Sequence, residues 1–322
     1  MKTISVVTPC YNEELTIREC HERVSAVFRD KLPNYALEHV FCDNASSDQT
    51  VAILREIAAT DPSVKVIVNA RNFGPMRSNY NGVMAASGDI VLLFLPADLQ
   101  DPPELIPEFV ALYEQGYDIV YGIRRVREES LAMRRVRAAY YAALTTFSEL
   151  DVPMGVGDFQ LVDRKVVEAM RQIRDAYPFM RMMTFECGFK AVGVPYTWGA
   201  RKRGFSKNNI ARLVDQGING LVTFTPAPLR LVLFVGGTIA ALSLLFAAFN
   251  IIVGLIYYHE LAPNGIMTII TALFFFGGIQ LFAIGVVAEY LQAVYAQVRA
   301  KPIVFEAERI NFAKAPERGG TE

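Results

Sequence analysis

Cysteine is scarce in this chain, and its four positions argue against two common roles. Cys10, Cys20, Cys42 and Cys187 lack metal-ligand spacing, and three of them lie in or beside apolar runs. We therefore expect reduced, structural thiols rather than a zinc site or a disulfide framework. Signal-peptide features are also missing, because the chain begins directly with the strand-like residues TISVVT. The sequence has no internal repeat, and its formal net charge of −1 excludes no class of partner.

Charge is missing from two long stretches near the C-terminus. Residues 231–258 and 266–288 contain no Asp, Glu, Lys or Arg. At 1.5 Å per residue in a helix, the shorter stretch spans roughly 34 Å, enough for a hydrocarbon core about 30 Å thick. A buried helix of that length without a polar face would be unusual in a soluble protein. We therefore expect two transmembrane helices, at about 231–258 and 266–290, within a membrane region at 229–291.

The distribution of basic residues predicts the orientation of this hairpin. The linker 257–265 has no Lys or Arg, whereas the segments on both sides contain several. The positive-inside rule then leaves both ends of the hairpin in the cytoplasm. We expect a cytoplasmic domain at 1–228, with amphipathic helices near the membrane, and a cytoplasmic C-terminal tail at 292–322. The expected location is the inner (plasma) membrane, crossed more than once.

Strand and helix patterns alternate through the first half of the chain. Strands are expected at 3–8, 37–43, 64–69, 90–95 and 118–122. Helices are expected at about 13–29 and 47–59, after the turn at 72–75 as far as about 87, and at about 103–114. The run 90–95 is continuously apolar, which indicates a central strand buried on both faces. Such β–α alternation predicts an α/β domain with a mostly parallel, Rossmann-like sheet and helices on both faces.

Polar residues follow three of the expected strands. They occur in residues 9–13 (PCYNE), 43–48 (DNASSD) and 97–101 (ADLQD). Ligands of open α/β sheets bind at the carboxyl ends of the strands. A carboxylate there, with a nearby amide oxygen, can coordinate a hard divalent cation that also binds a diphosphate. One acidic strand end could equally be a helix cap, but three at one sheet edge predict a polar crevice suited to a nucleotide.

Four motifs, in this order and spacing, carry a resemblance to a known family: PCYNE, DNASSDQT, RNFG and ADLQDPPE. They resemble the GT-A glycosyltransferases of the large inverting family that includes dolichol-phosphate mannose synthase. Four later motifs narrow the resemblance to a smaller group: DFQLVDRKVV at 158–167, GFKAVGVPY at 188–196, RKRGFSK at 201–207 and TPAPLRL at 225–231. With two C-terminal spans, they look like the bacterial polyprenyl-phosphate glycosyltransferases of the GtrB and ArnC type. The resemblance covers nearly the whole chain up to about residue 300.

This resemblance implies roles for individual residues. Those that would bind the nucleotide sugar are Pro9, Tyr11, Glu13, Asp43, Asn72, Asp98 and Lys207. Asp98 and Gln100 would bind the metal cofactor, Mg²⁺ or Mn²⁺, and Asp43 would contact the base. Asp98, Asp158 and Arg201 would be the catalytic residues, with Asp158 near the reacting centre. For Asp158 the alternative is a helix N-cap.

The acceptor would be a polyprenyl phosphate in the membrane. Arg134, Arg135 and Arg137, within an otherwise apolar helix, could meet its phosphate together with Ser206. A solvated or lipid-surface face is the alternative for these arginines. The segment 201–207 would be a flexible basic loop that closes over phosphates, and its alternative role is a topology signal beside the membrane.

Several positions depart from the family pattern. Pro96 replaces the first Asp of the usual DxD motif, so that only Asp98 remains of that pair. Asn44 stands where a second Asp is usual. Pro75 occupies the place of a frequent Lys, and Gln160 that of a usual Arg. These departures bear on base recognition and sugar choice more than on the expected metal site.

The expected reaction transfers a sugar from a UDP- or GDP-linked donor to the acceptor phosphate with inversion, for modification of cell-envelope glycans. A homo-oligomer, a tetramer by the resemblance, is a further expectation, and a nucleic-acid partner is not expected. Two alternatives stay open: a catalytically degenerate nucleotide-binding membrane protein, motivated by Pro96, and a transferase with another membrane acceptor. A processive polysaccharide synthase is disfavoured because the sequence lacks a QxxRW motif.

Overall fold

The structure is a computed structural model, and it describes residues 1–125, 156–197 except 174 and 176, scattered positions between 232 and 252, 266–298 and 301–312. Contacts divide the chain into two compact units. The first consists of Met1–Ala139, Leu150–Lys207 and Ala300–Glu322, and the second of Tyr140–Glu149 and Asn208–Arg299. All the strands of the sheet belong to the first unit.

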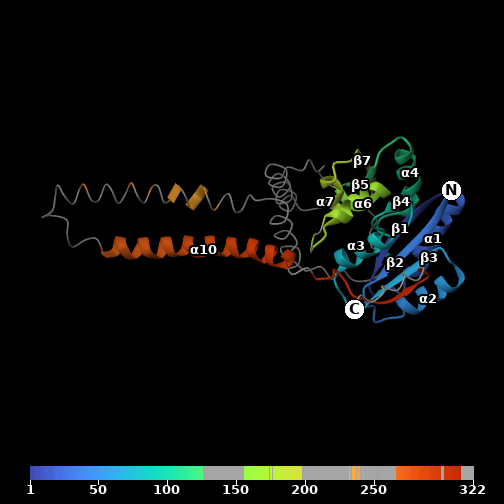
Figure 1. The fold of residues 1–322 in the computed structure, drawn as a ribbon, viewed down its shortest axis with the longest axis horizontal. Coiled ribbons are helices and arrows are strands. Elements are labelled where there is room, and N and C mark those ends of the chain that lie inside the picture. Colours follow the sequence, from blue (N-terminus) through green and yellow to red (C-terminus); the bar gives the residue numbers. More distant parts are fainter. Residues whose placement is uncertain are drawn as a thin grey trace, which may run out of the picture. The chain divides into compact units, whose positions relative to one another are not determined.

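The first unit is built around an eight-stranded sheet with the order β7-β5-β6-β4-β1-β2-β3-β8 (Figure 1). Its strands are β1 (Lys2–Cys10), β2 (Tyr35–Asp43), β3 (Val64–Asn69), β4 (Ile90–Leu92), β5 (Ile119–Arg125), β6 (Val156–Asp163), β7 (Ala191–Thr197) and β8 (Glu306–Ile310). β1 pairs in parallel with β2 and β4, β2 with β3, and β5 with β7. β6 and β8 run antiparallel to their neighbours. The expected α/β class with a mostly parallel sheet is confirmed.

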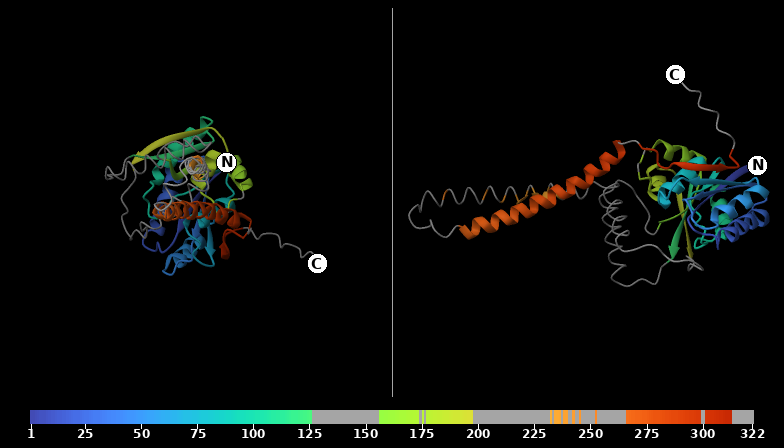
Figure 2. Two further views of the ribbon diagram at one scale, coloured as in Figure 1. Left: turned by 90° about the vertical axis from the view of Figure 1, so that its left-hand side faces the viewer. Right: turned by 90° about the horizontal axis from the view of Figure 1, so that it is seen from below.

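Helices cover both faces of this sheet (Figures 1 and 2). On one face lie α1 (Ile17–Lys31), α2 (Thr50–Thr60) and α4 (Ile106–Glu114), with the short 3₁₀ helix η1 (Pro103–Leu105) before α4. On the other lie α3 (Pro75–Ala85), α6 (Arg164–Gln172) and α7 (Met180–Glu186). Apolar contacts join the layers: the buried rings of Phe109 on α4 and Phe159 on β6 lie 4.9 Å apart. Burial of such side chains is the main favourable term in folding.

Helix α3 packs closely against the sheet because it carries Gly82 at the contact. A Cβ atom at this position would lie 2.0 Å from Cys42 Sγ and 2.9 Å from Val7 Cγ1. Any larger side chain would therefore push α3 away from β1 and β2. The close approach keeps the first turn of α3 at the end of β3, where Asn69 Nδ2 donates to Ser78 Oγ at 2.9 Å.

The antiparallel strands bring later parts of the chain to the ends of the parallel strands. In β6, Asp163 pairs with Ile90 at the start of β4, so the beginning of β6, with Asp158, lies where β4 ends. In β8, Glu306 pairs with Asn69, the last residue of β3. Figure 2 shows β8 in red beside the blue β3. We call the sheet edge where β1, β2, β3 and β4 end the carboxyl edge, and the opposite one the amino edge.

Several elements differ from the sequence-based expectation, and β6, α7 and β7 have no counterpart among the expected strands and helices. The strand expected at 90–95 ends at Leu92, although Leu95 stays buried and its N–H donates to Val7 O at 2.9 Å. The chain there leaves the regular ladder but keeps its place in the sheet. Strand β8 has no counterpart among the expected elements, because its residues fall in the expected tail at 292–322.

The second unit contains α10 (Ile266–Val298), a helix of 33 residues. Most of the other apolar stretch, 231–258, lies outside the described residues. Within the part of the chain that the structure describes, no helix is both long and apolar enough to cross a membrane. The expected transmembrane hairpin is therefore not shown by the structure.

Candidate active site

The strand order of the sheet reverses direction at β1. β2 and β3 lie on one side of β1, and β4 lies on the other. Open α/β sheets bind ligands outside the carboxyl ends of the strands at such a reversal of strand order. The polar segments 9–13, 43–48 and 97–101 come at or just after the ends of β1, β2 and β4. The structure therefore brings the three expected segments to one edge of the sheet.

Backbone strain marks the same edge. Asn12, Ala45 and Leu99 have φ values of 56°, 61° and 57°, in the left-handed region that favours glycine. Each lies a few residues after a strand that ends at the carboxyl edge. Among the described residues, one other non-glycine residue, Asn311, has a positive φ. Such conformations cost about 1–2 kcal/mol each and concentrate at functional sites.

The turns after β1 and β2 hold each other in place. Asn12 N–H donates to Ser46 Oγ at 2.9 Å, and Ser47 N–H donates to Asn12 Oδ1 at 2.8 Å. Glu13 N–H donates to Thr50 Oγ1, at the start of α2, at 2.9 Å. These reciprocal bonds offset the strain at Asn12, and they couple the position of the first motif to that of the second.

Three expected nucleotide-binding residues of the first motif lie at this edge. Pro9 pairs with Cys42 near the ends of β1 and β2. Tyr11, in the turn that follows, is 37% exposed. The Glu13 carboxylate accepts a hydrogen bond from Thr16 Oγ1 at 3.0 Å. Contact with a nucleotide stays a prediction for all three.

Asp43, the last residue of β2, is fully buried. Its Oδ2 accepts from Ser46 N–H at 2.9 Å, and its Oδ1 accepts from the Ser46 hydroxyl. Burial raises the pKa of Asp43 above its ordinary value, against the effect of these hydrogen bonds. The carboxylate thus fixes the turn that contains Ala45, and its expected contact with the base stays a prediction.

Amide side chains connect the ends of β2 and β3. Asn44 Nδ2 donates to Asn72 Oδ1 at 2.9 Å, and Asn44 Oδ1 accepts from Phe73 N–H at 2.9 Å. Asn72 Oδ1 also accepts from the N–H of Gly74, whose φ is 88°. The buried Asn69 side chain donates to Asn44 Oδ1 at 3.3 Å. An aspartate at position 44 could not donate to Asn72, so the departure from the family pattern suits this loop.

Asp98 and Gln100 follow the central strand β4, as expected. Gln100 N–H donates to Asp98 Oδ1 at 3.2 Å, and the strained Leu99 lies between them. Both expected metal ligands are half-buried. The described residues contain no group of three or more His, Cys, Asp or Glu side chains that could hold a metal. One carboxylate and one amide oxygen fit a hard cation that takes its other ligands from substrate phosphates and water.

A buried carboxylate next to these ligands is fixed by two later strands. Asp101 is fully buried, and Arg124 Nη2, from β5, donates to its Oδ2 at 3.1 Å. The Tyr196 hydroxyl, from β7, donates to Asp101 Oδ1, and Arg124 Nε donates to Tyr196 Oη at 3.1 Å. This network anchors the loop that carries Asp98. Sequence reasoning gave no role to Arg124 or Tyr196, and the signals for them were an arginine after an apolar strand and the motif GFKAVGVPY.

Asp158, near the start of β6, forms an ion pair with Arg181 of α7. Arg181 Nε donates to Asp158 Oδ1 at 3.1 Å, and Arg181 Nη2 donates to Asp158 Oδ2. Burial opposes ionisation of Asp158, but the charges of Arg181 and Arg124 hold its pKa below the ordinary value. The alternative of a helix N-cap is wrong for Asp158, because Asp163 caps α6 and accepts from Lys165 N–H at 2.9 Å.

Gln160 holds α7 against β6. Its Oε1 accepts from Thr184 Oγ1 at 2.8 Å, and its Nε2 lies 3.0 Å from Gly157 O and 3.4 Å from Arg181 O, as donor to both. The side chain is fully buried. Gln160, where the family pattern has Arg, thus supports the backbone of the residue that pairs with Asp158.

The expected site residues fall into two groups. Those that the structure brings to the carboxyl edge are Pro9, Tyr11, Glu13, Asp43, Asn72, Asp98, Gln100 and Asp158. Those that lie outside the described residues are Arg134, Arg135, Arg137, Arg201, Ser206 and Lys207. The roles of the second group at the phosphates stay predictions.

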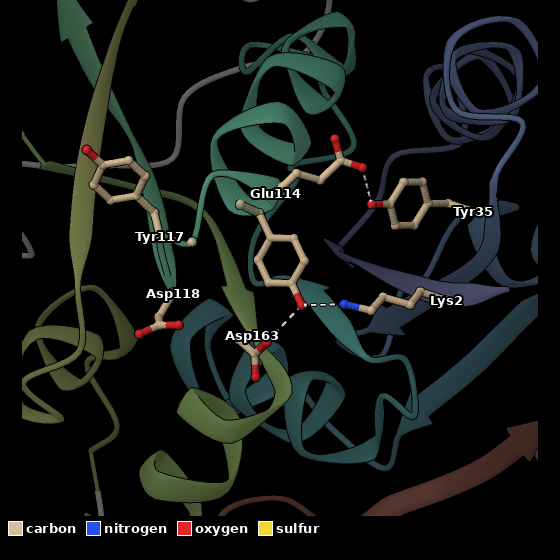
Figure 3. A pocket seen from close by; sticks show the side chains of 8 residues that line it. Lys2, Tyr35, Glu114, Tyr117, Asp118 and Asp163 are labelled. Carbon is tan, nitrogen blue, oxygen red and sulfur yellow. Dashed lines mark hydrogen bonds between the residues drawn. The ribbon is translucent and has the colours of Figure 1, made fainter.

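A pocket of about 420 Å³ lies at the amino edge, away from these residues (Figure 3). It is lined by Lys2, Tyr35, Tyr113, Glu114, Gly116, Tyr117, Asp118 and Asp163. Tyr113 Oη accepts from Lys2 Nζ at 3.1 Å and donates to Asp163 Oδ2 at 2.9 Å, and Tyr35 Oη donates to Glu114 Oε1 at 2.6 Å. Five of the lining side chains bond to one another in this way, Asp118 pairs with Lys165, and no expected site residue lines the pocket.

Comparisons with known proteins bear on the family of the chain. The family model described as glycosyl transferase family 2 matches residues 5–171. The uncharacterized glycosyltransferase YkcC of Bacillus subtilis is 33% identical over 300 residues, 93% of this chain and 91% of that protein. The SfII prophage-derived bactoprenol glucosyl transferase of Shigella flexneri is 32% identical over 300 residues, 93% of this chain and 96% of that protein.

Among solved structures, glucosyl-3-phosphoglycerate synthase from Mycobacterium tuberculosis, in complex with Mn²⁺, UDP and glucosyl-3-phosphoglycerate, is 23% identical to this chain. The match has a TM-score of 0.46 and covers 67% of this chain and 76% of that one. The family model and the two near full-length relatives decide the assignment. The chain belongs to glycosyl transferase family 2, and it is a glycosyltransferase.

Proposed function

We propose that this enzyme transfers a sugar from a nucleotide-sugar donor to the phosphate of a membrane polyprenyl phosphate, with inversion at the anomeric carbon. The product would serve the modification of cell-envelope glycans. The observation that carries this proposal is the extent of the likeness to the bactoprenol glucosyl transferase of Shigella flexneri, which spans 93% of this chain and 96% of that protein. Such coverage reaches beyond the sheet domain into the apolar C-terminal region.

Attachment to a membrane would support a lipid acceptor. The stretches 231–258 and 266–288 carry no charge. Helix α10 exposes large apolar side chains, and Leu273, Leu281 and Leu291 are 69%, 72% and 66% exposed. Exposed leucines are unfavourable in water and favourable against lipid. We place the two stretches across the membrane as a hairpin, with the catalytic domain and both termini cytoplasmic, because the flanking segments are basic.

The donor diphosphate would lie at Asp98 and Gln100, which would hold Mg²⁺ or Mn²⁺. A bound cation would neutralise the charge that grows on the departing nucleoside diphosphate. The chain's own contribution is orientation. The strained turn at Leu99, with the bond from Gln100 N–H, sets the direction of the Asp98 carboxylate. Asp101, fixed by Arg124, holds the next residues of the same loop.

A phosphate monoester needs little basic assistance as the acceptor. Its second pKa is about 6, so the oxygen that attacks the anomeric carbon is largely ionised at pH 7. Asp158, kept ionised by Arg181, would therefore orient the acceptor or the sugar rather than take a proton. The positive charges of Arg181 and Arg124 beside it reduce the repulsion between this carboxylate and a phosphate.

Residues outside the described part complete the proposal. Those proposed to meet the acceptor phosphate are Arg134, Arg135, Arg137 and Ser206. Arg201 and Lys207 would close over the donor and stabilise charge on the leaving diphosphate. Neutralising either should reduce turnover while the protein stays folded and inserted. Near-normal transfer by both Arg201→Ala and Lys207→Ala would leave the segment 201–207 as a topology signal alone.

The test of the proposed function is transfer by the purified full-length protein. It would receive UDP- and GDP-linked sugars in turn, with a short polyprenyl phosphate and Mg²⁺ or Mn²⁺. We expect one donor to yield a lipid-linked sugar phosphate whose anomeric configuration, read by NMR, is opposite to that of the donor. Nucleotide binding without transfer from any donor would contradict the proposal and favour the degenerate alternative that Pro96 motivates. A retained configuration would contradict inversion alone.

A further inference from the structure

The C-terminal strand β8 is the last strand in the sheet order, and it lies beside a loop of the candidate site. This loop, residues 70–74, joins β3 to α3 and contains the expected nucleotide-binding residue Asn72. Because β8 is antiparallel to β3, its first residue, Glu306, pairs with Asn69 at the carboxyl edge. The residue before the strand, Phe305, therefore lies next to the start of the loop.

Phe305 contacts the loop through both its backbone and its ring. Ala70 N–H donates to Phe305 O at 2.8 Å. The rings of Phe73 and Phe305 have centroids 6.3 Å apart, within the range of a favourable aromatic pair. The Arg71 guanidinium lies 4.0 Å from the centroid of the Phe73 ring. Phe305 is nevertheless 57% exposed, so the ring is not simply part of the core.

Glu306 ties the same strand end to the helix that follows the loop. Asn81 Nδ2, on α3, donates to Glu306 Oε1 at 2.5 Å. Arg309 donates to the same carboxylate, and these bonds hold the pKa of Glu306 below its ordinary value although burial opposes this. Two consecutive residues therefore contact the loop and the helix after it: Phe305 bonds to the loop where β3 ends, and Glu306 bonds to the middle of α3.

The opposite side of the loop is held by the amide of Asn44. Asn44 bonds to the Asn72 side chain and to Phe73 N–H. The loop is thus fastened on two sides, by the end of β2 and by the start of β8. Without the second contact, the bond at Ala70 and the aromatic partner of Phe73 would be lost, and Gly74 would give the loop backbone freedom.

We propose that Phe305 and Glu306 are positioning residues of the donor site, which hold the loop 70–74 in its nucleotide-binding shape. The segment that follows α10 would then help to shape the donor site, and it would not be a dispensable tail. This inference rests on one part of the proposed function, the nucleotide-sugar donor, and not on the lipid acceptor. The rest of β8 is anchored elsewhere: Arg55 Nη2, on α2, donates to Glu308 Oε2 at 2.6 Å.

The test compares nucleotide binding by full-length variants. UDP, and GDP in a separate titration, would be added with MnCl₂ to the wild type and to the double variant Phe305→Ala/Glu306→Ala. We expect the Kd of the nucleotide that the wild type binds to rise roughly tenfold, the effect of losing a coupled pair of contacts. Where transfer is measured, the donor KM should rise while kcat at saturating donor changes little.

Two further variants separate positioning from general destabilisation. Glu308→Ala removes an exposed ion pair from the same strand and should leave the Kd within about twofold of the wild type. Glu306→Gln keeps an oxygen acceptor for Asn81 and should recover most of the affinity that Glu306→Ala loses. The inference is overturned if the double variant binds the nucleotide as the wild type does, or if Glu308→Ala weakens binding equally.

The same titrations distinguish this inference from the proposed function. UDP and GDP bind without a lipid acceptor, so the comparison of Kd values needs no transfer. A wild type that binds a nucleotide but never modifies polyprenyl phosphate would remove the proposed function and leave the positioning role standing. A double variant with unchanged Kd would remove the positioning role alone.

Discussion

The two edges of one sheet differ in how their polar groups are used. At the amino edge, the groups around the pocket bond to one another: Lys2 and Asp163 meet at Tyr113, and Tyr35 donates to Glu114. At the carboxyl edge, polar side chains instead hold strained turns and one another's loops in place. An amino-edge counterpart of this strain is Asn311, after β8, and its Nδ2 donates to Ala58 O and Val64 O.

If the substrate binds at the carboxyl edge, as we propose, a hollow on the surface is a poor guide to the site in this protein. The amino-edge pocket forms where β1, β2, β5 and β6 meet the end of α4, and its charged side chains bond to tyrosine hydroxyls or, for Asp118, to Lys165. The carboxyl edge concentrates backbone strain, an acidic loop after β4 and the ion pair at the start of β6. Strain that neighbouring bonds hold in place indicates function more directly than volume does.

The largest effect should follow from neutralising the expected metal ligand at the carboxyl edge. Asp98→Asn keeps the shape of the side chain but removes the charge that a divalent cation requires, so transfer should fall by about 100-fold or more. The matched amino-edge variant is Asp118→Asn, which breaks a partly exposed pair with Lys165 and should leave the rate within about twofold. A folded Asp98→Asn enzyme with near-full metal-supported activity would break the comparison.

A smaller loss should follow from removing the partner of Asp158. Arg181→Met should lower transfer by about tenfold to 100-fold, because Asp158 would lose its orientation and much of its ionisation. The folded pKa of Asp158 is depressed, so its ionised form and the associated stability are present above the unfolded pKa of about 4 and lost as pH falls.

Without Arg181, burial would raise this pKa, and the acidic limb of the pH–activity profile should move to higher pH. Arg181→Lys keeps the positive charge and should shift the limb less. An acidic limb that stays in place in Arg181→Met would show that Asp158 is not titrating in the reaction.

Asp43 tests whether a buried carboxylate at the carboxyl edge acts on the ligand or only on its own turn. Asp43→Ala should weaken nucleotide binding by roughly tenfold and change turnover at saturating donor less, because β2 ends by the expected base. Ser46→Ala removes the hydroxyl that donates to Asp43 but leaves the carboxylate. Equal losses in the two variants would reduce Asp43 to a turn-holding role, and unchanged donor affinity in Asp43→Ala would refute its place by the base.

A histidine pair between α1 and β2, His21 and His39, predicts a pH dependence of stability that belongs to neither edge. His39 Nε2 lies 3.0 Å from Thr8 Oγ1, and its Nδ1 lies 3.3 Å from His21 Nδ1. Burial lowers the pKa of both rings, and for His39 the charge of His21 adds to the effect. Unfolded histidine takes up a proton near pH 6.5. Below that pH, the free energy of unfolding should therefore fall by up to about 1.4 kcal/mol per pH unit for each of the two rings.

Urea unfolding between pH 5 and 8 would measure this loss. Stability should be full above about pH 6.5 and fall on acidification, and His39→Gln should flatten the fall. A profile that stays flat in the wild type would contradict the buried, neutral state of the pair.

The smallest effect is expected at the amino-edge pocket. Tyr113→Phe removes the hydroxyl that lies between Lys2 and Asp163, and it should cost about 1 kcal/mol of stability or less. Transfer should stay within about twofold of the wild type when both are assayed well below their unfolding temperatures. A large fall in transfer with unchanged stability would give the amino edge a role that the comparison denies it.

The parts of the site that sequence could predict are those with local signals. The continuous apolar run before Pro96 indicated a buried strand, and the polar residues after it indicated a strand end. Asp98 and Asp43 therefore lie where the pattern of strands and turns predicts. Their roles in binding stay predictions, because hydrogen bonds such as that between Asp43 and Ser46 depend on the detailed shape of a turn.

The parts that sequence did not predict depend on pairing between distant strands. Arg124 and Tyr196 meet Asp101 because β5 and β7 are parallel neighbours, and Asp158 reaches the site because β6 is antiparallel to β4. Strand β8 (EAERI) has three charged residues among only five positions and no regular alternation, so its sequence does not separate an edge strand from a polar tail.

The central claim, that the substrate binds at the carboxyl edge, is tested most directly by amide hydrogen exchange. The wild-type protein would be measured alone and with UDP or GDP and MnCl₂, whichever nucleotide it binds. We predict slower exchange in 9–13, 43–48, 70–74 and 97–101, and no change in the amino-edge segment 113–118. Protection confined to 113–118 would contradict the claim and move the site to the other edge of the sheet.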